Sequence, residues 1–296
     1  IIGAGIWSLC RFRLPKGRSL PVSRQLLIGH RGCRLGNPVG EGPPPENTLD
    51  AFQYSLDKGA DGFELDTRLT KDGVPVVFHD ARIGRCLVRG EGSNARVSEL
   101  TVREMKCLPF KQAPDVRVPT LEEALELAAQ RHAKVLVETK DIFHPEQLAF
   151  QVVGLIRKHN LLEDALVISF DPRSLYYVRR TDPEVRTCLL WIPGLVSAWN
   201  AKGTEVLPPS WRLLSPLIDV ALTVGAHPAL LPSFLGVSAV GPQSAFRRTH
   251  LRRAWRRGIA TYLWVINDEP LRVDVNGLAG AGLFAYSTDR LWPGDS

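Results

Sequence analysis

Cysteine is scarce in this sequence and never closely paired. The chain of 296 residues holds five cysteines, and no two of them form a Cys-x-x-Cys pair. An odd number of widely spaced cysteines fits neither a disulfide framework nor a zinc site. A Gly-x-Gly-x-x-Gly or Walker-type loop is also missing, which argues against a nucleotide-binding fold. The sequence has no Asn-x-Ser/Thr sequon either, so a secreted protein is less strongly indicated.

Apolar runs of the length that crosses a bilayer are missing as well. The apolar stretch Ile1–Cys10 is too short for a membrane-spanning helix. Prolines and Asp219 make the apolar stretch Trp211–Leu231 a poor spanning helix. Because the chain begins with Ile1 and not with Met, we expect a fragment. Two interpretations of residues 1–24 stay open: the end of a truncated membrane anchor, or a frayed N-terminus.

The charge balance is basic. Hydrophobic residues make up 44% of the chain and charged residues 23%, which is typical of a globular protein. The formal net charge of +6 favours anionic partners in general. Six arginines crowd one predicted helix, Ser244–Arg257: Arg247, Arg248, Arg252, Arg253, Arg256 and Arg257. Without a recognition motif or an aromatic ladder, nucleic acid is not an expected partner. A solvated helix face is favoured, followed by contact with acidic lipid headgroups.

Strand-like and helix-like runs alternate along most of the chain. The expected strands are Gln25–Gly29, Gly62–Leu69, Val74–Phe78, Lys134–Lys140, Ala165–Phe170, Val185–Trp191, Gly236–Val240, Ile259–Ile266 and about Gly282–Tyr286. The expected helices are Leu49–Lys58, Ser98–Leu108, Thr120 to about Arg131, Pro145–His159, Pro172–Thr181, Ser244–Arg257 and a short one near Pro270–Asn276. This alternation predicts a parallel sheet with helical crossovers. About eight strands over roughly 265 residues favour an α/β fold of the (β/α)₈ TIM-barrel type.

The predicted barrel extends over residues 25–296 and is interrupted once. Residues 193–232 contain six prolines and depart from the alternation of strands and helices. We expect this segment to be an apolar, proline-rich insertion. Two roles stay open for the insertion: covering the barrel mouth or touching a membrane surface.

Two carboxylates share one face of an otherwise apolar strand. In Gly62–Leu69, side chains alternate between faces, so Glu64 and Asp66 point one way while Phe63 and Leu65 point the other. Two like charges on a buried face repel each other and are costly to desolvate. A hard cation between them would remove that cost, and carboxylate oxygens are the ligands that Mg²⁺ and Ca²⁺ prefer.

A third carboxylate follows the same logic on another strand. Glu138 lies near the end of Lys134–Lys140, and Lys140 shares its face. Glu64, Asp66 and Glu138 together could ligate one divalent cation and leave positions open for water or substrate. The alternative is that these carboxylates form ordinary salt bridges or lie at the surface. We expect one divalent cation, with Mg²⁺ favoured over Ca²⁺.

Further polar residues fall near the ends of predicted strands, the face that carries barrel active sites. His30 and His79 each follow a strand and could act as base and acid, although a single histidine is more often structural. Arg31 and Lys140 beside a metal would bind phosphate. Glu46 and Asn47 in the first loop could bind substrate, and helix capping is the alternative role for Asn47. Trp264 on a late strand could be a core residue or a substrate platform.

The order of these motifs resembles the glycerophosphodiester phosphodiesterase family. The matching motifs are His30-Arg31-Gly32, Glu46-Asn47-Thr48, Gly59–Asp66, Thr70–Gly73, His79-Asp80, Pro119–Glu123, Glu138-Thr139-Lys140, Ser169-Phe170 and Thr288-Asp289. The resemblance covers about Leu26 to Asp289. Within the family, Ser169–Leu190 and the apolar insertion are most similar to the membrane-associated animal branch, which implies an endomembrane or plasma-membrane protein.

The resemblance implies a TIM-barrel enzyme that hydrolyses glycerophosphodiesters, such as glycerophosphoinositol, to glycerol 3-phosphate and an alcohol. It implies a mechanism through a cyclic phosphate that water then opens. The implied roles are metal ligation by Glu64, Asp66 and Glu138, acid/base catalysis by His30 and His79, phosphate contacts by Arg31 and Lys140, and substrate contact by Glu46 in the first loop.

The sequence departs from the family pattern in two places. The loop Cys33–Pro45 is long and rich in Pro and Gly, and Tyr286-Ser287 precedes Thr288-Asp289 where an aliphatic residue is usual. Two alternatives stay open. The first keeps the chemistry but takes lysophospholipids or N-acyl lysophospholipids in the manner of a lysophospholipase D. The second is a non-catalytic, membrane-bound interaction module.

Overall fold

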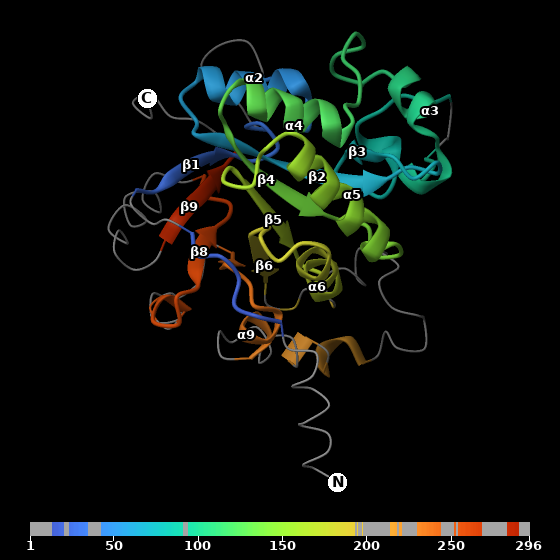
Figure 1. Ribbon diagram of the computed structural model, residues 1–296. Coiled ribbons are helices and arrows are strands. Elements are labelled where there is room, and N and C mark those ends of the chain that lie inside the picture. The colour runs from blue at the N-terminus through green and yellow to red at the C-terminus, as the bar shows by residue number, and fades with distance from the viewer. Residues whose placement is uncertain are drawn as a thin grey trace.

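A closed barrel of parallel strands forms the centre of the molecule (Figure 1). The computed structural model describes residues 14–20, 24–34, 43–90, 94–192, 194, 197, 214–217, 219–220, 230–243, 252, 254–267 and 283–289. Within these residues, eight parallel strands pair side by side, and β1 pairs with both β9 and β2 to close the barrel. They are β1 (Leu26–Gly29), β2 (Gly62–Leu69), β4 (Lys134–Thr139), β5 (Ala165–Ser169), β6 (Thr187–Trp191), β7 (Ala239–Pro242), β8 (Ala260–Leu263) and β9 (Leu283–Thr288). The predicted (β/α)₈ barrel is confirmed.

Helices surround the barrel. They are α2 (Leu49–Asp57), α4 (Leu121–Gln130), α5 (Pro145–Lys158), α6 (Pro172–Thr181) and the short α9 (Leu231–Leu235). Side-chain caps begin α2, α4 and α6. A capping box begins α4: the Thr120 side chain accepts from the Glu123 backbone N–H, and the Glu123 carboxylate accepts from the Thr120 N–H. The side chain of Thr48 caps α2 by accepting from the Ala51 N–H. These caps satisfy backbone groups that the first helical turn leaves unpaired.

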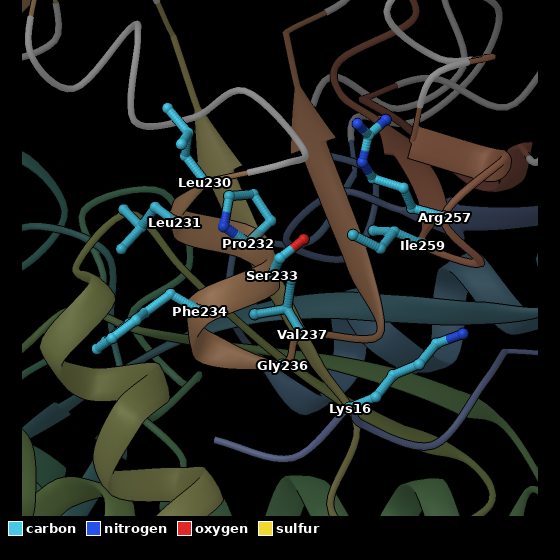
Figure 2. Close-up of a pocket in the computed structure, with 10 residues that line it drawn as sticks. All are labelled: Lys16, Leu230, Leu231, Pro232, Ser233, Phe234, Gly236, Val237, Arg257 and Ile259. Carbon is cyan, nitrogen blue, oxygen red and sulfur yellow. The ribbon is translucent and has the colours of Figure 1, made fainter. Parts of the chain in front are cut away.

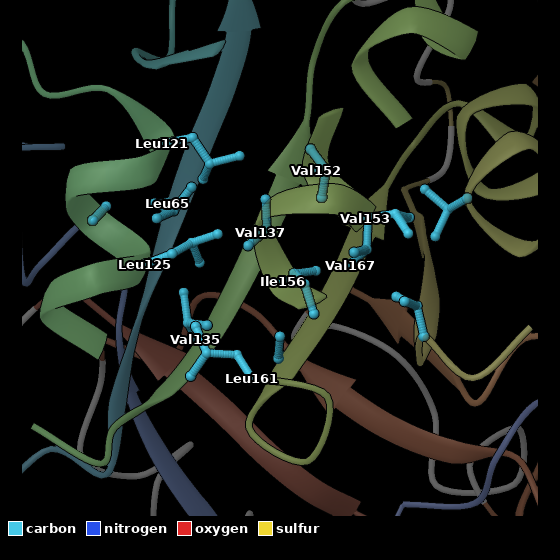
Figure 3. Close-up of a cluster of buried hydrophobic side chains, with 14 of the residues drawn as sticks. Leu65, Leu121, Leu125, Val135, Val137, Val152, Val153, Ile156, Leu161 and Val167 are labelled. Carbon is cyan, nitrogen blue, oxygen red and sulfur yellow. The ribbon is translucent and has the colours of Figure 1, made fainter. Parts of the chain in front are cut away.

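Because strand side chains alternate between faces, the barrel has two apolar cores: one between the strands and the helices, and one inside the barrel. Phe63 and Leu65 point outward from β2 into a cluster shared with the helices, while Leu136 of β4 points into the barrel. Figure 3 shows Leu121 and Leu125 of α4 facing Leu65 across this outer core. Burying an aliphatic side chain of this size stabilises a fold by about 1.5–3 kcal/mol. Because the outer face takes the apolar side chains, the inner face of β2 is left for Glu64 and Asp66.

The strand after β2 does not join the barrel. β3 (Pro75–Val77) pairs antiparallel with the end of β2, in register Thr67 with Val77. Because β3 runs back along β2, the residues that follow it lie beside Asp66. The Asp66 carbonyl accepts from the Phe78 N–H at 2.8 Å. The predicted position of His79 at the barrel mouth is therefore reached by a hairpin that folds back and not by a parallel strand.

Residues between β3 and α4 form a small satellite with its own apolar core. It contains η1 (Ile83–Arg85), η2 (Val97–Glu99) and α3 (Val102–Cys107). Its buried members are Val76, Phe78, Ile83, Leu87, Val97, Leu100, Met105, Phe110 and Val118. The helix predicted for Ser98–Leu108 is confirmed over Val102–Cys107, but its first part is wrong, because Thr101 is extended (φ −72°, ψ 159°) and caps α3 after η2 has ended. A local cap outweighs the helical periodicity at this point.

The described part of the N-terminal segment lies against the amino end of the barrel. The Leu14 N–H donates to the Phe234 carbonyl and the Gly17 N–H to the Gly236 carbonyl. Leu20 packs on the apolar barrel interior. Residues 14–20 are thus part of the folded unit, although they fall in the segment 1–24 that we separated from the barrel domain.

An open hollow of about 840 Å³ lies at the same end, before β7 and β8. Figure 2 shows Leu231, Pro232 and Phe234 along one side, and Lys16 and Arg257 near Ile259. None of the predicted site residues lines it, so this hollow is not the candidate active site. Among the described helices, none is both long enough and apolar enough to cross a membrane.

Several sequence expectations fall outside the described residues. Most of the insertion 193–232 does so, as do most of the predicted Arg-rich helix and the helix near Pro270–Asn276. Of the six clustered arginines, Arg252, Arg256 and Arg257 are described and exposed.

Candidate active site

Three carboxylates from two neighbouring strands converge inside the barrel. In the parallel pairing of β2 with β4, Asp66 stands beside Glu138, and Glu64 lies one inward position earlier. One carboxylate oxygen from each residue lies within 4.8 Å of the others. The three residues are at most 7% exposed. The alternation that predicted a shared face is confirmed, and the strand register adds the third carboxylate.

Glu64, Asp66 and Glu138 form a carboxylate triad. Their three carboxylates outnumber the two cations beside them, Arg31 and Lys140. Burial, with the charges of Asp66 and Glu138, raises the pKa of Glu64 well above its usual range. Burial also raises the pKa of Glu138, although Lys140 opposes the shift. Burial would raise the pKa of Asp66 too, but Lys140 and Arg31 outweigh it and lower that pKa.

Two buried carboxylate oxygens of the triad have no hydrogen-bond partner. Glu64 Oε1 and Asp66 Oδ1 have no hydrogen-bond donor, although Lys140 Nζ lies 3.2 Å from Asp66 Oδ1 as an ion pair. Buried polar atoms are nearly always satisfied, so unpaired carboxylate oxygens need an explanation. A divalent cation ligated by oxygen would satisfy both atoms and offset the excess charge. The residues present therefore fit a hard metal ion.

Two cations border the triad. Lys140 Nζ donates to Glu138 Oε1 at 2.5 Å, which confirms that the two residues share a face. Arg31 Nε lies 3.2 Å from Asp66 Oδ2, and the Arg31 backbone N–H donates to Glu64 Oε2 at 3.0 Å. This geometry needs a tight turn after β1. Gly32 has φ +78°, and a Cβ there would stand 2.6 Å from Ala51 of α2.

His30 follows β1 directly and is held by a carboxylate from the last strand. Its Nδ1 lies 2.6 Å from Asp289 Oδ1, and its Nε2 lies 3.9 Å from Glu64 Oε2. Asn267 donates to Asp289 at 2.8 Å, and Arg34 is at 3.3 Å. Burial would raise the pKa of Asp289, but His30, Asn267 and Arg34 hold it well below its usual range. An ionised Asp289 orients the imidazole with Nε2 toward the triad.

His79 is held in the same way from the other side. Its Nδ1 lies 2.6 Å from Asp80 Oδ1. Burial, opposed by Asp66, lowers the pKa of His79 to about 4, so its imidazole is neutral near pH 7. Arg68 of β2 donates to the His79 carbonyl at 2.8 Å and to the Lys140 carbonyl at 3.0 Å. One partly buried arginine thus fixes the backbone on both sides of the site.

The loop before α2 is fastened to the triad strand. Asn47 donates from Nδ2 to Asp66 Oδ2 at 2.8 Å and accepts from the Asp66 N–H at 3.1 Å. The helix-capping role considered for Asn47 belongs to Thr48 instead. Glu46 accepts from Arg31 Nη1 at 3.1 Å and from Arg85 Nη2 at 2.5 Å. Its side chain is 9% exposed, so Glu46 is a charged residue of the mouth and not of the open surface.

Trp264 lies directly after β8, at the same end of the barrel. Its indole N–H donates to the Gly241 carbonyl at 2.7 Å, and its ring meets Phe170 edge to face at 5.3 Å between centroids. The residue is partly exposed and packs on the barrel interior. These two contacts fix the position of the indole at the carboxyl end of the barrel.

The structure brings seven predicted site residues together around one point and adds partners that sequence reasoning missed. The seven are Glu64, Asp66, Glu138, His30, His79, Arg31 and Lys140. The added partners are Arg34, Asn267, Arg68, Arg85 and the carboxylate of Asp289. Asp289 is the last residue of the family motif Thr288-Asp289, and this match was the one sequence signal that could have indicated a role for it. The arrangement can bind a hard cation, hold an anion and transfer protons from two fixed imidazoles.

Solved structures of similar fold support this architecture. A glycerophosphodiester phosphodiesterase from Agrobacterium tumefaciens aligns with a TM-score of 0.66 at 21% identity, covering 90% of this chain and 97% of that one. An Oleispira antarctica phosphodiesterase in complex with the product sn-glycerol-3-phosphate aligns with a TM-score of 0.67 at 22% identity, covering 91% of this chain and 93% of that one. At these identities the likeness concerns the fold.

Sequence comparison shows the family as well as the fold. A glycerophosphodiester phosphodiesterase of Caldanaerobacter subterraneus is 34% identical over 184 residues, which are 60% of this chain and 71% of the relative. Glycerophosphodiester phosphodiesterase 1 of Mus musculus is 28% identical over 285 residues, which are 90% of this chain and 82% of the relative. The profile of the Glycerophosphoryl diester phosphodiesterase family matches residues 30–291. The chain therefore belongs to the glycerophosphoryl diester phosphodiesterase family.

Proposed function

We propose that this chain hydrolyses glycerophosphodiesters to glycerol 3-phosphate and an alcohol. The observation that carries the proposal is the buried triad flanked by two histidines, each fixed at Nδ1 by its own carboxylate. The names of the relatives support the same activity, and the Oleispira antarctica structure holds sn-glycerol-3-phosphate as its product. An intact set of metal-binding and acid/base groups speaks against a non-catalytic interaction module.

Glu64, Asp66 and Glu138 would hold one divalent cation. When bound, such an ion polarises a phosphoryl oxygen and stabilises the charge that develops on it. A site with only three protein carboxylates suits Mg²⁺ better than Ca²⁺, because Mg²⁺ keeps several water ligands and Ca²⁺ takes six to eight oxygens. Arg31 and Lys140 keep positive charge beside the triad, where the phosphodiester would bind.

The two histidines transfer the protons. In the first step one imidazole takes the proton of a glycerol hydroxyl as its oxygen bonds to phosphorus. The other imidazole gives a proton to the departing alcohol as the phosphorus–oxygen ester bond breaks. In the second step water opens the cyclic phosphate, and the histidines exchange roles. Asp289 keeps His30, and Asp80 keeps His79, in the orientation that both steps need.

Glu46, fixed between Arg31 and Arg85, would contact the glycerol. The ring of Trp264 would form part of the wall of the substrate site.

Lysophospholipids are the second candidate substrates. Four large apolar side chains of the insertion are exposed: Leu214 (43%), Leu217 (67%), Val220 (62%) and Leu230 (49%). Exposed apolar side chains in one segment favour contact with an acyl chain or a lipid surface. The chemistry would be unchanged, and only the leaving group would differ.

A comparison of substrates tests this assignment. We expect release of glycerol 3-phosphate from glycerophosphoinositol and glycerophosphocholine in the presence of Mg²⁺, measured with a coupled dehydrogenase. Lysophosphatidylcholine and N-acyl lysophosphatidylethanolamine in detergent form the second arm, measured by release of lysophosphatidic acid. Turnover confined to the second arm would replace the first candidate by a lysophospholipase D. Turnover in neither arm would contradict the phosphodiesterase proposal.

We further propose that the amino end of the barrel contacts a membrane surface. Leu230 and Trp255 are exposed there by 49% and 40%, and the cations Lys16 and Arg257 line the adjoining hollow. Exposed apolar side chains beside cations suit acidic lipid headgroups. The double change Leu230→Ser and Trp255→Ser should lower co-sedimentation with phosphatidylserine vesicles by about tenfold. Phe150→Ser removes a more exposed apolar side chain (69%) from α5 and should have no effect. Equal sedimentation of both variants would refute membrane contact at this end.

A further inference from the structure

Arg85 connects two carboxylates that belong to opposite sides of the candidate site. It ends η1, in the satellite that follows β3. Its Nε donates to Asp80 Oδ2 at 2.5 Å, and its Nη2 and Nη1 donate to the two oxygens of Glu46 at 2.5 and 3.2 Å. All three guanidinium nitrogens therefore bond to carboxylates of the chain.

The bonds of Arg85 extend a continuous charged network. Asp80 uses its other oxygen for His79 Nδ1 at 2.6 Å. Glu46 accepts from Arg31 Nη1 at 3.1 Å, and Arg31 in turn reaches Asp66 of the triad. The network thus runs from an acid/base imidazole, through Arg85, to a residue beside the metal-binding carboxylates. Charge-assisted bonds of this kind are among the strongest hydrogen bonds in proteins.

The backbone that carries Arg85 is anchored independently of the site. Ile83 is fully buried in the satellite core, and its N–H donates to the Ala95 carbonyl at 3.0 Å. Leu87, two residues beyond Arg85, is 2% exposed in the same core. The guanidinium is therefore held from a rigid base, although the side chain itself is 47% exposed.

The protonation of its two partners agrees with this arrangement. Burial would raise the pKa of Glu46, but bonds from Arg85 and Arg31 lower it. Burial would raise the pKa of Asp80 as well, and His79 with Arg85 lowers it instead. Both carboxylates are thus ionised at neutral pH and able to accept the bonds that the geometry shows.

We propose that Arg85 is a positioning residue of the phosphodiesterase reaction, which fixes His79 through Asp80 and ties the satellite to the Glu46 loop. The inference rests on the proposed function. Arg85 acts through these carboxylates, because each of its three guanidinium nitrogens donates to one of them. Loss of Arg85 leaves Asp80 with His79 as its side-chain partner and without the bond that fixes its other oxygen, so the imidazole is less firmly oriented for proton transfer. Arg31 still holds Glu46 from the other side, so substrate binding changes little.

Arg85→Ala should therefore lower kcat by about 10- to 100-fold, the range typical of groups that orient an active residue, and change KM by less than about threefold. Arg85→Lys, which keeps the charge but has a single donor group, should fall between the wild type and Arg85→Ala. Arg82→Ala is the matched control, because Arg82 lies on the same segment, is exposed, and bonds to the Asn94 carbonyl. It should retain wild-type kcat.

A double-mutant cycle with Asp80→Asn separates positioning from direct action on the substrate. If Arg85 acts through Asp80, adding Arg85→Ala to Asp80→Asn should cost less than about threefold in kcat. Losses that multiply, or a kcat of Arg85→Ala within twofold of Arg82→Ala, would overturn the inference. Should Arg85→Ala fail to fold, as judged by its thermal transition, Arg85→Lys carries the same cycle. A wild-type chain that releases no glycerol 3-phosphate would instead refute the proposed function, and that result is seen before any variant is compared.

Discussion

Replacing Glu64 by Gln is expected to lower metal-dependent turnover by about a thousandfold or more. Glu64 contributes one of three carboxylates to the buried triad, and an amide is a much weaker ligand for a hard cation. A bound metal supplies several kcal/mol of transition-state stabilisation, and each 1.4 kcal/mol corresponds to a factor of ten in rate. The fold should survive, because Gln has the same shape and removes a like charge from a site where burial raises the pKa of Glu64.

Two measurements check this expectation: Mg²⁺ affinity by isothermal titration calorimetry, and kcat with saturating Mg²⁺. Glu126→Gln provides the control, since Glu126 is exposed on α4 and away from the triad. Its Mg²⁺ affinity and kcat should equal those of the wild type. Unchanged Mg²⁺ affinity together with full turnover in Glu64→Gln would remove the metal assignment.

Replacing His30 by Ala is expected to lower kcat by about 100- to 10,000-fold, the usual contribution of a positioned acid/base group. Mg²⁺ affinity should stay within a few-fold of the wild type, because His30 Nε2 lies 3.9 Å from Glu64 and is not one of the triad ligands. Asp289→Asn should produce a smaller loss of about 10- to 100-fold, since it weakens the orientation of the imidazole and leaves the imidazole in place.

The control for His30 is His144→Ala. His144 is a histidine after β4 whose side chain is 59% exposed, and its removal should leave kcat unchanged. If His30→Ala turned over substrate as fast as His144→Ala, the histidine would be structural. A larger loss in Asp289→Asn than in His30→Ala would also contradict the order that we expect.

The triad could be predicted from the sequence because its signal is local. Glu64 and Asp66 are two residues apart on a strand whose other face is apolar, and strand geometry alone puts them together. Glu138 needed one more step, the parallel register of β2 with β4, which the alternation of strands and helices implies. The barrel as a whole followed from the same alternation.

The carboxylate partner of His30 could not be predicted in the same way, whereas the partner of His79 is its neighbour in the sequence. Asp289 meets His30 across 259 positions of the chain, and only closure of β9 on β1 brings them together. The antiparallel direction of β3 could not be predicted from the hydrophobic pattern either, because side chains alternate with a period of two in parallel and antiparallel strands alike. Arg85 gave no signal, since its role depends on a satellite whose core is assembled from short, irregular segments.

The most direct test of the account follows glycerol 3-phosphate release from glycerophosphoinositol through removal and return of the metal. The wild-type chain is assayed with Mg²⁺, after chelation, and after Mg²⁺ is added back, beside His30→Ala with Mg²⁺ throughout. The account predicts release, its loss on chelation, its recovery with Mg²⁺, and almost none from His30→Ala. Release that neither chelation nor the loss of His30 reduces would contradict a metal-dependent, histidine-catalysed phosphodiesterase.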